Sequence, residues 1–372
     1  MGARLDLRPD EIPTTRTTST SSVPGPRPPV VPRGGIRMKT YGFGVIGMGL
    51  AGRAQAAAIV KNSRARLKAI CTPSARRLDA TAAEFQPDVA TTDFQKLLAA
   101  GLDVLVVCTP DHLHTDYVSA GLESGLHILC EKPLVTKLND ARLLVDRARR
   151  SGKVFMTGQC ARFFTRSGLA RAMVDQGELG DLFFVEADYL HNCEEFFSSG
   201  WRVDPAAPQN MALGGGCHPI DLLRWLAGDV AEVYAVANRK CFAPGNPIAH
   251  DCILMSLKFC SGAIGKVLVS VGCRRPYSLG LSLYGNKGTL VDEKLFLAKV
   301  PNLQDFMPVP VGSHGHDLGY IFEEQLAHLV ECMDAGRQPM ADAVEGAKTV
   351  ATCLAAIESI ETGKVVRVCN EF

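Results

Sequence analysis

The chain has 372 residues, and at about 150 residues per domain this length predicts two domains. Lys and Arg number 40 against 39 Asp and Glu, a formal net charge of +1, which argues against a nucleic acid or an anionic membrane as the main partner. Hydrophobic residues make up 47%, and no apolar run approaches about 18 residues, so the composition excludes a disordered chain and a transmembrane helix.

Residues 1–37 differ in composition from the rest of the chain. They contain seven prolines, six arginines and three acidic residues, so this segment carries +3 and the remainder −2. A Thr- and Ser-rich run from Thr14 to Ser22 leaves few side chains for a core. We therefore expect residues 1–37 to form a disordered tail outside both domains. The segment has no apolar stretch of the signal-peptide kind, so it gives no support for export.

Strands and helices alternate along residues 38–157. The predicted strands are short and apolar: Tyr41–Ile46, Ala65–Cys71, Val104–Cys108, His127–Cys130 and Val154–Thr157. The predicted helices fill the gaps between them: Leu50–Val60, a helix that ends at Glu84, Tyr117–Ser124 and Asn139–Arg150. Strand–helix alternation at this spacing predicts right-handed crossovers and a doubly wound parallel sheet.

Residues 158–372 have a different texture. The predicted strands are Leu182–Leu190, Val230–Ala237, Cys252–Phe259, Ala263–Val271 and Leu279–Tyr284. Four helices flank them: Gly168–Gln176, Pro219–Leu226, Tyr320–Ala335 and Val344–Glu361. Consecutive strands without intervening helices predict an open, mostly antiparallel sheet. The second domain is therefore expected to be α+β.

The first strand runs into a G-x-G-x-x-G fingerprint, which consists of Gly47, Met48, Gly49, Leu50, Ala51 and Gly52. Gly47 permits a tight turn, Gly49 lets a pyrophosphate approach the backbone, and Gly52 allows close packing of helix on strand. The following helix N-terminus offers free N–H groups and a positive dipole to phosphates. The fingerprint predicts a dinucleotide cofactor; the alternative is a structural glycine turn without a ligand.

The end of the second strand bears on the choice between NAD and NADP. NAD-binding proteins of this kind carry an acidic residue there for the ribose 2′-hydroxyl, but no acid occurs before Asp79. Thr72 offers a hydrogen bond, and Arg76 and Arg77 are suited to a 2′-phosphate. The pattern favours NADP, while the alternative is that the two arginines are solvated helix charges.

A Glu131-Lys132-Pro133 triplet follows the strand that ends at Cys130, at the carboxyl edge of the predicted parallel sheet. Ligands bind at that edge in open α/β folds. An ammonium there can hydrogen-bond a substrate oxygen that gains or loses a proton, and a partly dry site is expected to lower its pKa. Glu131 is expected to orient Lys132 or to contact the nicotinamide. The alternative is a surface charge pair.

The chain resembles the glucose-fructose oxidoreductase / inositol dehydrogenase / MocA family across residues 38–372. The resemblance rests on the glycine fingerprint and on motifs that follow in order, namely Cys108-Thr109-Pro110 with His114, Glu131-Lys132-Pro133, and His218-Pro219-Ile220-Asp221. It implies a Rossmann domain at 38–157 and a substrate-binding and oligomerisation domain at 158–372. It also implies hydride transfer between nicotinamide and a sugar, inositol or sugar-derivative carbon. The exposed face of the open C-terminal sheet is a natural surface for a homodimer or homotetramer, and the family pairs through it as well.

The resemblance also assigns residue roles. Thr109 and Pro110 form a wall near the cofactor, and His114 contacts the cofactor or packs the turn. Lys132 and His218 are the catalytic candidates, because a His titrates near the working pH and can relay the hydroxyl proton. Asp221 lies one helical turn after His218, on the same predicted face, and is expected to hold the tautomer of the ring or to contact substrate hydroxyls.

One position departs from the family pattern. Many sugar and inositol dehydrogenases of the family place an Asp four residues before the histidine, and this chain has Gly214 there. The departure keeps two alternatives open. One is a redox-neutral lyase or glycosidase-like enzyme that holds its nicotinamide, and the other is a non-catalytic nicotinamide-binding regulatory protein.

Further substrate-binding candidates are Arg162, Trp201 and Arg202, with Tyr189, His191 and Asn192 as weaker ones. His314 and His316 suggest a metal, but no third ligand stands at a suitable spacing, so no metal is expected. The thirteen cysteines are scattered, odd in number and without a C-x-x-C pair. That pattern is typical of a reducing cytoplasm. Only Cys217 stands next to a proposed catalytic residue.

Overall fold

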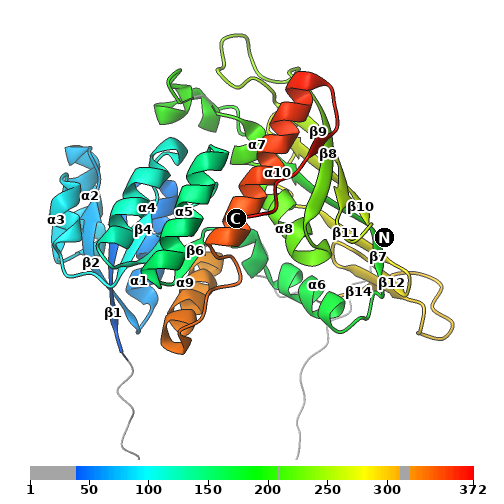
Figure 1. Cartoon of the computed structure of the whole chain (residues 1–372), viewed down its shortest axis with the longest axis horizontal. Coiled ribbons are helices and arrows are strands. Elements are labelled where there is room, and N and C mark those ends of the chain that lie inside the picture. Colours follow the sequence, from blue (N-terminus) through cyan, green and yellow to red (C-terminus); the bar gives the residue numbers. More distant parts are fainter. Residues whose placement is uncertain (1–38, 208, 311–317) are drawn as a thin grey trace, which may run out of the picture. The chain divides into compact units, whose positions relative to one another are not determined.

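The computed structural model describes residues 39–207, 209–310 and 318–372 (Figure 1). The predicted tail therefore lies outside the described residues. Two sheets organise the described part of the chain, one with six strands and one with nine. Among the residues that the structure describes, no helix combines the length and the apolar character needed to cross a membrane.

The six-stranded sheet is parallel throughout and has the order β3-β2-β1-β4-β5-β6. Its strands are β1 (Tyr41–Ile46), β2 (Ala65–Cys71), β3 (Val89–Thr91), β4 (Val104–Val107), β5 (His127–Cys130) and β6 (Phe155–Thr157). The strand order reverses between β1 and β4, which is the point where doubly wound folds bind dinucleotides. The predicted sheet is confirmed. The short β3 was missed because three residues carry too little pattern.

Helices cover both faces of this sheet. They are α1 (Leu50–Lys61), α2 (Ala75–Phe85), α3 (Phe94–Leu98), α4 (His114–Glu123) and α5 (Leu138–Ser151), and the short 3-10 helix η1 (Asp111–Leu113) precedes α4. Every residue of β1 and β4 is buried, as expected for strands with helices on both sides. Alternate residues go to opposite cores, so Phe43 and Val45 pack on the side of α1 while Leu105 and Val107 pack on the side of α4 and α5.

The nine-stranded sheet has the order β14-β13-β12-β11-β7-β10-β9-β8-β15. Its strands are β7 (Leu182–Leu190), β8 (Val230–Asn238), β9 (Cys252–Phe259), β10 (Ile264–Ser270), β11 (Leu281–Gly285), β12 (Gly288–Val291), β13 (Lys294–Leu297), β14 (Met307–Pro308) and β15 (Val366–Arg367). All neighbours are antiparallel except β7 and β10. The mostly antiparallel prediction is confirmed, and the parallel pair arises because β7 enters the sheet between β10 and β11.

The helices after β6 join the two sheets. They are α6 (Thr165–Asp175), α7 (Met211–Gly214), α8 (Cys217–Ala227), α9 (Leu318–Ala335) and α10 (Ala343–Thr362), with 3-10 turns at Cys160–Phe163 (η2), Phe196–Ser198 (η3) and Gly200–Val203 (η4). In Figure 1, α10 runs between α5 and the second sheet, and it packs on α5, α8 and β8. Although α9 lies in the segment predicted as the second domain, it packs on α1 and shares the core of the first sheet.

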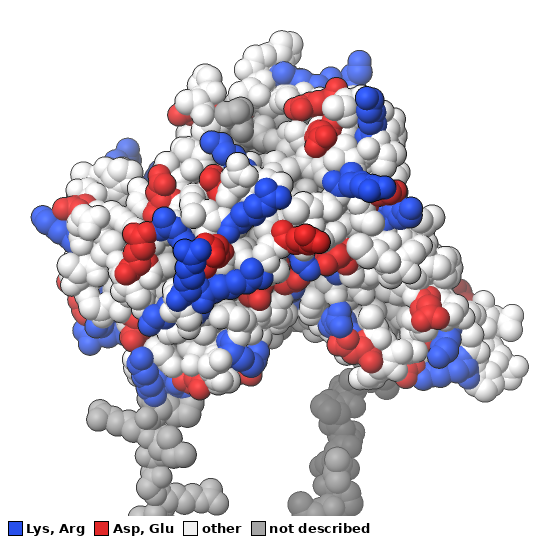
Figure 2. Space-filling model, viewed as in Figure 1, with Lys and Arg blue, Asp and Glu red and all other residues white. Residues whose placement is uncertain are grey.

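The charged side chains follow the near-neutral composition. On the face drawn in Figure 2, Lys and Arg lie interspersed with Asp and Glu, without a broad area of one sign. A nucleic-acid-binding face would present a contiguous basic stripe or patch. The visible face therefore offers no such footprint.

Candidate functional site

The glycine fingerprint forms the turn between β1 and α1. Gly47 has φ +90°, and a Cβ at that position would lie 2.4 Å from the carbonyl oxygen of Cys108. A Cβ at Gly52 would lie 1.9 Å from the carbonyl oxygen of Gly47. Both glycines are therefore required by packing, whereas a Cβ at Gly49 would meet nothing within 4 Å.

This open approach leads to the N-terminus of α1. Leu50 is 74% exposed, and the first turn carries neither an acidic residue nor a side-chain cap. Its N–H groups and its positive dipole are thus free for an anion. The geometry fits the pyrophosphate of a dinucleotide. Met48 contributes backbone only, because its side chain is buried in the apolar core.

The neighbouring strand ends carry the other predicted cofactor residues. Thr72 is buried at the end of β2, while Arg76 and Arg77 are exposed in the first turn of α2. No ion pair joins either arginine to another described residue. At the end of β4, the buried Thr109 hydroxyl has no hydrogen-bond partner in the described chain. Such an orphaned polar group beside the glycine turn is consistent with a bound ligand or water.

Lys132 lies one residue beyond Glu131, directly after β5. Its Nζ donates a hydrogen bond to the carbonyl oxygen of Gly214 at 2.9 Å, and the Lys132–Pro133 peptide bond is cis. Burial by itself would lower the pKa of the Lys132 ammonium, but Cys217, Asp111 and further acidic groups outweigh it and raise that pKa. The expected lowering was wrong, because the groups around the ammonium stabilise its charged form.

Glu131 is buried and hydrogen-bonded to α1 rather than left on the surface. The amide Nε2 of Gln55 in α1 donates to Glu131 Oε1 at 3.0 Å and to Oε1 of Gln325 in α9 at 2.9 Å. The backbone N–H of Lys132 approaches Glu131 Oε2 at 3.4 Å. Burial raises the pKa of Glu131 above its ordinary value. The surface-pair alternative is therefore wrong for Glu131, which lies inside the fold and braces the turn that carries Lys132.

His114 is fully buried at the start of α4, with 0% exposure. Its Nδ1 lies 2.9 Å from the carbonyl oxygen of Pro133, and its Nε2 lies 3.0 Å from that of Thr109. Despite burial, contacts with Cys130 and Asp111 and these carbonyls raise the pKa of His114 to about 10. The ring joins two turns as a cation and has no exposed surface for a cofactor, so direct cofactor contact is corrected to turn packing.

His218 is the second residue of α8 and is 7% exposed. Its ring stacks on the ring of Tyr189 with centroids 5.6 Å apart and an interplanar angle of 16°. Burial, followed by the charges of Lys132 and His191, lowers the pKa of His218 well below 6.5. The ring is therefore neutral at working pH and can accept a proton.

An aromatic wall faces His218 from β7 and the loop before β11. Tyr189 and His191 alternate along the chain and meet edge to face at 4.9 Å, and Tyr277 meets His191 at 5.2 Å. The buried Nε2 of His191 has no partner in the described chain. Tyr277 was missed because it lies in an irregular loop, whereas the spacing of residues 189 and 191 already places both on one face of a strand.

Asp111 was also missed, although it closely follows a buried strand of the parallel sheet. Burial raises the pKa of this carboxyl more than His114, Lys132 and Arg202 lower it. The neighbouring His112 ring lies 6.4 Å from the ring of Trp201. The loop that contains Trp201 and Arg202 thus reaches the strand end beside Lys132. Position at the carboxyl edge of β4 was the signal that could have found Asp111.

Arg162 and Asp221 lie in a different environment from the one predicted. The guanidinium of Arg162 donates to both carboxylate oxygens of Asp221 at 2.8 Å and to Glu345 at 2.9 Å. Asp221 is 0% exposed and also accepts the hydroxyl of Thr349 at 3.0 Å. No hydrogen bond joins Asp221 to the His218 ring in the described chain. Both residues are therefore corrected from substrate contacts to a buried ion pair.

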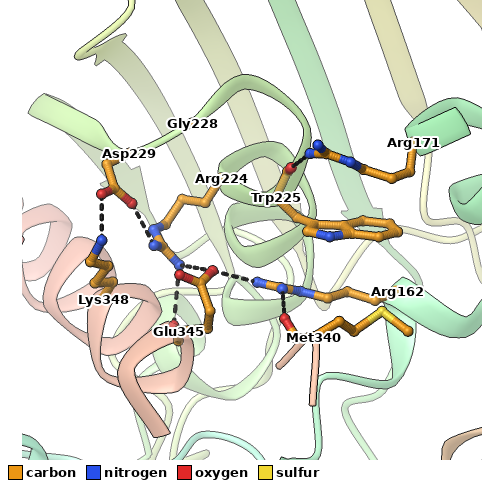
Figure 3. A pocket seen from close by; sticks show the side chains of 9 residues that line it. All are labelled: Arg162, Arg171, Arg224, Trp225, Gly228, Asp229, Met340, Glu345 and Lys348. Atoms are coloured by element: carbon orange, nitrogen blue, oxygen red, sulfur yellow. Dashed lines mark hydrogen bonds and ion pairs between the residues drawn. The ribbon is translucent and has the colours of Figure 1, made fainter. Parts of the chain in front are cut away.

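This ion pair belongs to a larger network around a hollow of about 450 Å³ (Figure 3). Figure 3 shows Arg224 between Glu345 and Asp229, with Lys348 on the other side of Asp229. None of Lys132, His218 and Tyr189 lines this hollow. Its cations and carboxylates compensate one another. The ion pairs also tie η2, α8 and α10 together.

No group of three or more His, Cys, Asp or Glu side chains suited to a metal occurs among the described residues. His314 and His316 lie outside those residues. All thirteen cysteines are free thiols. Burial raises the pKa of Cys217, next to His218, to about 12, although the charge of Lys132 acts in the opposite direction.

Comparison with known proteins agrees with the fold and with the family resemblance. Residues 41–159 match the oxidoreductase family with an NAD-binding Rossmann fold, and residues 169–291 match the GFO/IDH/MocA C-terminal domain. A 1,5-anhydro-D-fructose reductase of Ensifer adhaerens is 24% identical over 335 residues, which cover 88% of this chain and 98% of that protein. A D-xylose 1-dehydrogenase (NADP(+)) of Haloferax volcanii is 25% identical over 333 residues, covering 87% and 98%.

The solved structures give the same result for the fold. Levoglucosan dehydrogenase in complex with NADH and levoglucosan superposes with a TM-score of 0.80 at 20% identity, covering 90% of this chain and all of that one. The family matches cover the first sheet and β7 to β12 of the second, and they include the glycine turn, the Lys132 turn and the first helix residues after Gly214. The chain belongs to the Gfo/Idh/MocA family of oxidoreductases, with an NAD-binding Rossmann domain and the C-terminal domain of that family.

Proposed function

We propose that the protein transfers hydride between a nicotinamide cofactor and a carbinol or carbonyl carbon of a sugar, an inositol or a sugar derivative. The observation that carries this proposal is the placement of two groups: the carbonyl oxygen of Gly214 holds Lys132 Nζ, and His218, four residues further on, stacks on Tyr189. The pKa of Lys132 is raised, which keeps it protonated, and the pKa of His218 is lowered, which keeps it neutral. One group can donate to an oxygen while the other accepts its proton.

In this mechanism the nicotinamide supplies the hydride acceptor or donor. The Lys132 ammonium hydrogen-bonds the reacting oxygen of the substrate and stabilises negative charge that develops on it. His218 takes the hydroxyl proton during oxidation and returns it during reduction. Stacking on Tyr189 fixes the plane of the imidazole. The Gly214 carbonyl orients the ammonium, at the position where the family pattern places an Asp.

The proposed substrate contacts are Lys132, His218, Trp201 and Arg202. For the cofactor, we propose a preference for NADP over NAD, supported by the exposed Arg76 and Arg77 beside Thr72. Fluorescence titration with NADPH and NADH measures this preference. Replacement of both arginines by Ala is expected to weaken NADPH binding and leave NADH binding unchanged, and equal losses for the two cofactors would contradict it.

Turnover tests the reaction itself. Purified protein, loaded with NADP or NAD, is assayed at the absorbance band of the reduced nicotinamide over a panel of sugars and polyols. Reduction of the cofactor by one of them supports the proposal. Cofactor binding without any turnover supports a regulatory protein instead, and conversion of a glycoside without net cofactor change supports the redox-neutral alternative.

We also propose a homodimer or homotetramer that pairs through the uncovered face of the second sheet. Two cross-strand apolar rows support it: Val236–Leu254–Leu268 and Ile264–Phe184–Tyr284. A face of this kind suits a self-complementary interface with a second copy. Light scattering after size exclusion is expected to show an oligomer that Val236→Glu with Ile264→Glu dissociates. Val60→Glu, an exposed position on α1, is the control.

The free cysteines are in keeping with a proposed cytoplasmic location.

A further inference from the structure

The Arg202 guanidinium contacts two aromatic rings, and the charge of Asp111 acts on it without a direct ion pair. The guanidinium lies 3.7 Å from the ring centroid of Phe196 and 4.7 Å from that of Trp201. No ion pair or hydrogen bond joins that guanidinium to another described residue, although the side chain is partly buried. Two aromatic contacts hold the planar group in one orientation and leave its five N–H donors available.

Two residues, Asp111 and Cys193, lie near both the guanidinium of Arg202 and the ammonium of Lys132. The charges of Arg202 and Lys132 both act on Asp111, which follows β4. Both charges also act on Cys193, which lies two residues beyond His191. Trp201 meets His112 across the same gap. The guanidinium of Arg202 and the ammonium of Lys132 therefore act on the same residues at the end of β4 and after β7.

The arginines of the Figure 3 hollow differ from Arg202, because each of them forms ion pairs. Arg162 and Arg224 each contact two carboxylates. Around Lys132 and Arg202 the carboxyl groups are Asp111 and Glu131, and burial raises the pKa of both. These carboxyls make no ion pair with either cation in the described chain, unlike the carboxylates of the Figure 3 hollow. A desolvated cation without a partner is costly unless a ligand supplies the anion.

We propose that the substrate is an anionic sugar, whose carboxylate or phosphate group binds Arg202 while Lys132 and His218 act on a CH–OH group of the same molecule. The inference rests on the proposed oxidoreductase function and narrows its substrate class. A guanidinium presents parallel N–H donors that match two oxygens of a carboxylate or phosphate. A neutral sugar would leave these donors without a charged acceptor.

Matched sugars test the inference. The holoenzyme is assayed with D-glucose, D-glucuronate, D-gluconate and D-glucose 6-phosphate, and with the corresponding galactose series. We expect one anionic sugar to exceed its neutral counterpart in kcat/KM by about ten- to a hundredfold, the range of a charge-assisted hydrogen bond. The preferred anion distinguishes a carboxylate from a phosphate substrate. Preference for the neutral sugars in both series overturns the inference.

Variants locate the effect at the guanidinium. Arg202→Gln is expected to bring the ratio of kcat/KM for the anionic sugar to kcat/KM for its neutral counterpart close to one, since an uncharged sugar gains little from the charge. Arg202→Lys keeps the charge but loses the fork, so it is expected to fall between the two. Arg274→Gln is the matched control, because Arg274 is exposed and lines a separate hollow. An anion preference that survives in Arg202→Gln overturns the inference.

Binding separates this inference from the proposed reaction. The fluorescence of bound NADPH or NADH is followed while each sugar is added, which requires no turnover. If no sugar reacts but anionic sugars bind and Arg202→Gln abolishes that binding, the oxidoreductase proposal fails and the anion site stands. If neutral sugars react and no anionic sugar binds, the anion site fails and the oxidoreductase proposal stands.

Discussion

Helix α8 contributes to two clusters of ionisable groups, and only one of them consists of ion pairs. At its first turn, His218 stacks on Tyr189 and faces Lys132, with unpartnered polar atoms nearby. One turn later, Asp221 and Arg224 belong to a network in which carboxylates meet guanidinium groups at hydrogen-bond distance. The first cluster holds groups whose pKa values are shifted in opposite directions. The second holds buried charges that compensate one another.

This difference indicates that the His218 cluster serves the reaction and that the Asp221 cluster serves the stability of the fold. Groups that must gain and lose protons cannot be locked in strong ion pairs, whereas a buried pair stabilises the fold only while both partners are present. Substitutions at the His218 end are therefore expected to change rates, and substitutions at the Asp221 end are expected to change stability. Each prediction below tests one side of this division.

The largest effect is expected from Lys132→Met. Loss of the ammonium removes the donor to the reacting oxygen, so turnover should fall by about 10²–10⁴-fold, the usual contribution of a positioned acid or base. Steady-state kinetics measures the loss. Thermal unfolding and cofactor affinity serve as controls and should stay close to those of the unchanged protein. Full activity in the variant would contradict the role given to Lys132.

Asp221→Asn is expected to act on stability instead. It leaves the buried Arg162 facing a neutral amide, and breaking a buried pair in this way costs about 3–5 kcal/mol of unfolding free energy. Urea unfolding followed by circular dichroism measures it. His218→Asn, three residues earlier, is the matched comparison and should lose activity with a much smaller loss of stability. An inactive but fully stable Asp221→Asn protein would place Asp221 in the site after all.

The two buried histidines predict opposite pH effects. The pKa of His114 rises from 6.5 to about 10 on folding, so its contribution to stability is complete below pH 6.5 and is lost as the pH rises toward 10. Urea unfolding between pH 7 and about 10 should show this decline, and His114→Gln should flatten it. A slope that is the same in both proteins would mean that His114 is neutral when folded.

The pKa of His218 is lowered, so its protonation affects activity at low pH, whereas His114 affects stability at high pH. A neutral base loses function only when it is protonated, which places the acid limb of the kcat/KM profile below pH 6.5. The pH dependence of kcat/KM measures the position of that limb. A limb at or above 6.5 would show that His218 is solvated like a free imidazole.

The smallest effects concern two adjacent glycines. A Cβ at Gly215 would lie 2.8 Å from the ring of Tyr189, whereas one at Gly214 would meet the flexible end of Met211 at 3.2 Å. Gly215→Ala is therefore expected to push Tyr189 off His218 and to cost about 1–3 kcal/mol through overpacking. Gly214→Ala is the control and should be close to neutral in thermal unfolding and kcat. Equal effects of the two substitutions would show that the stack of Tyr189 on His218 does not depend on the missing Cβ of Gly215.

Much of the fold could be predicted because it depends on local pattern. The bounds of β1, β2, β5, β7 and β9 were predicted to the residue, since buried strands are short apolar runs between breakers. The glycine turn was predictable because Gly47 and Gly52 meet backbone atoms within the same β–α unit or on the adjacent strand end. The position of Lys132 followed from its place directly after a buried strand.

The partners of α8 could not be predicted in this way. His218 and Asp221 are three residues apart, and three residues rotate a helix by about 300°, which leaves their side chains about 60° apart. On a half-exposed helix both would share one face. Almost every residue of α8 is buried, however, so this angle is enough to direct one side chain toward Lys132 and the other toward Arg162.

The sequence alone determined the order of the strands and helices, the family, the glycine turn and the two residues proposed for catalysis. Tertiary structure decided which charges are compensated and which are not. It buried His114 between two carbonyl oxygens, raised the pKa of Lys132 and left the guanidinium of Arg202 between aromatic rings. The physical reason is that a charge state depends on desolvation and on neighbours far away in the chain, which local pattern does not encode.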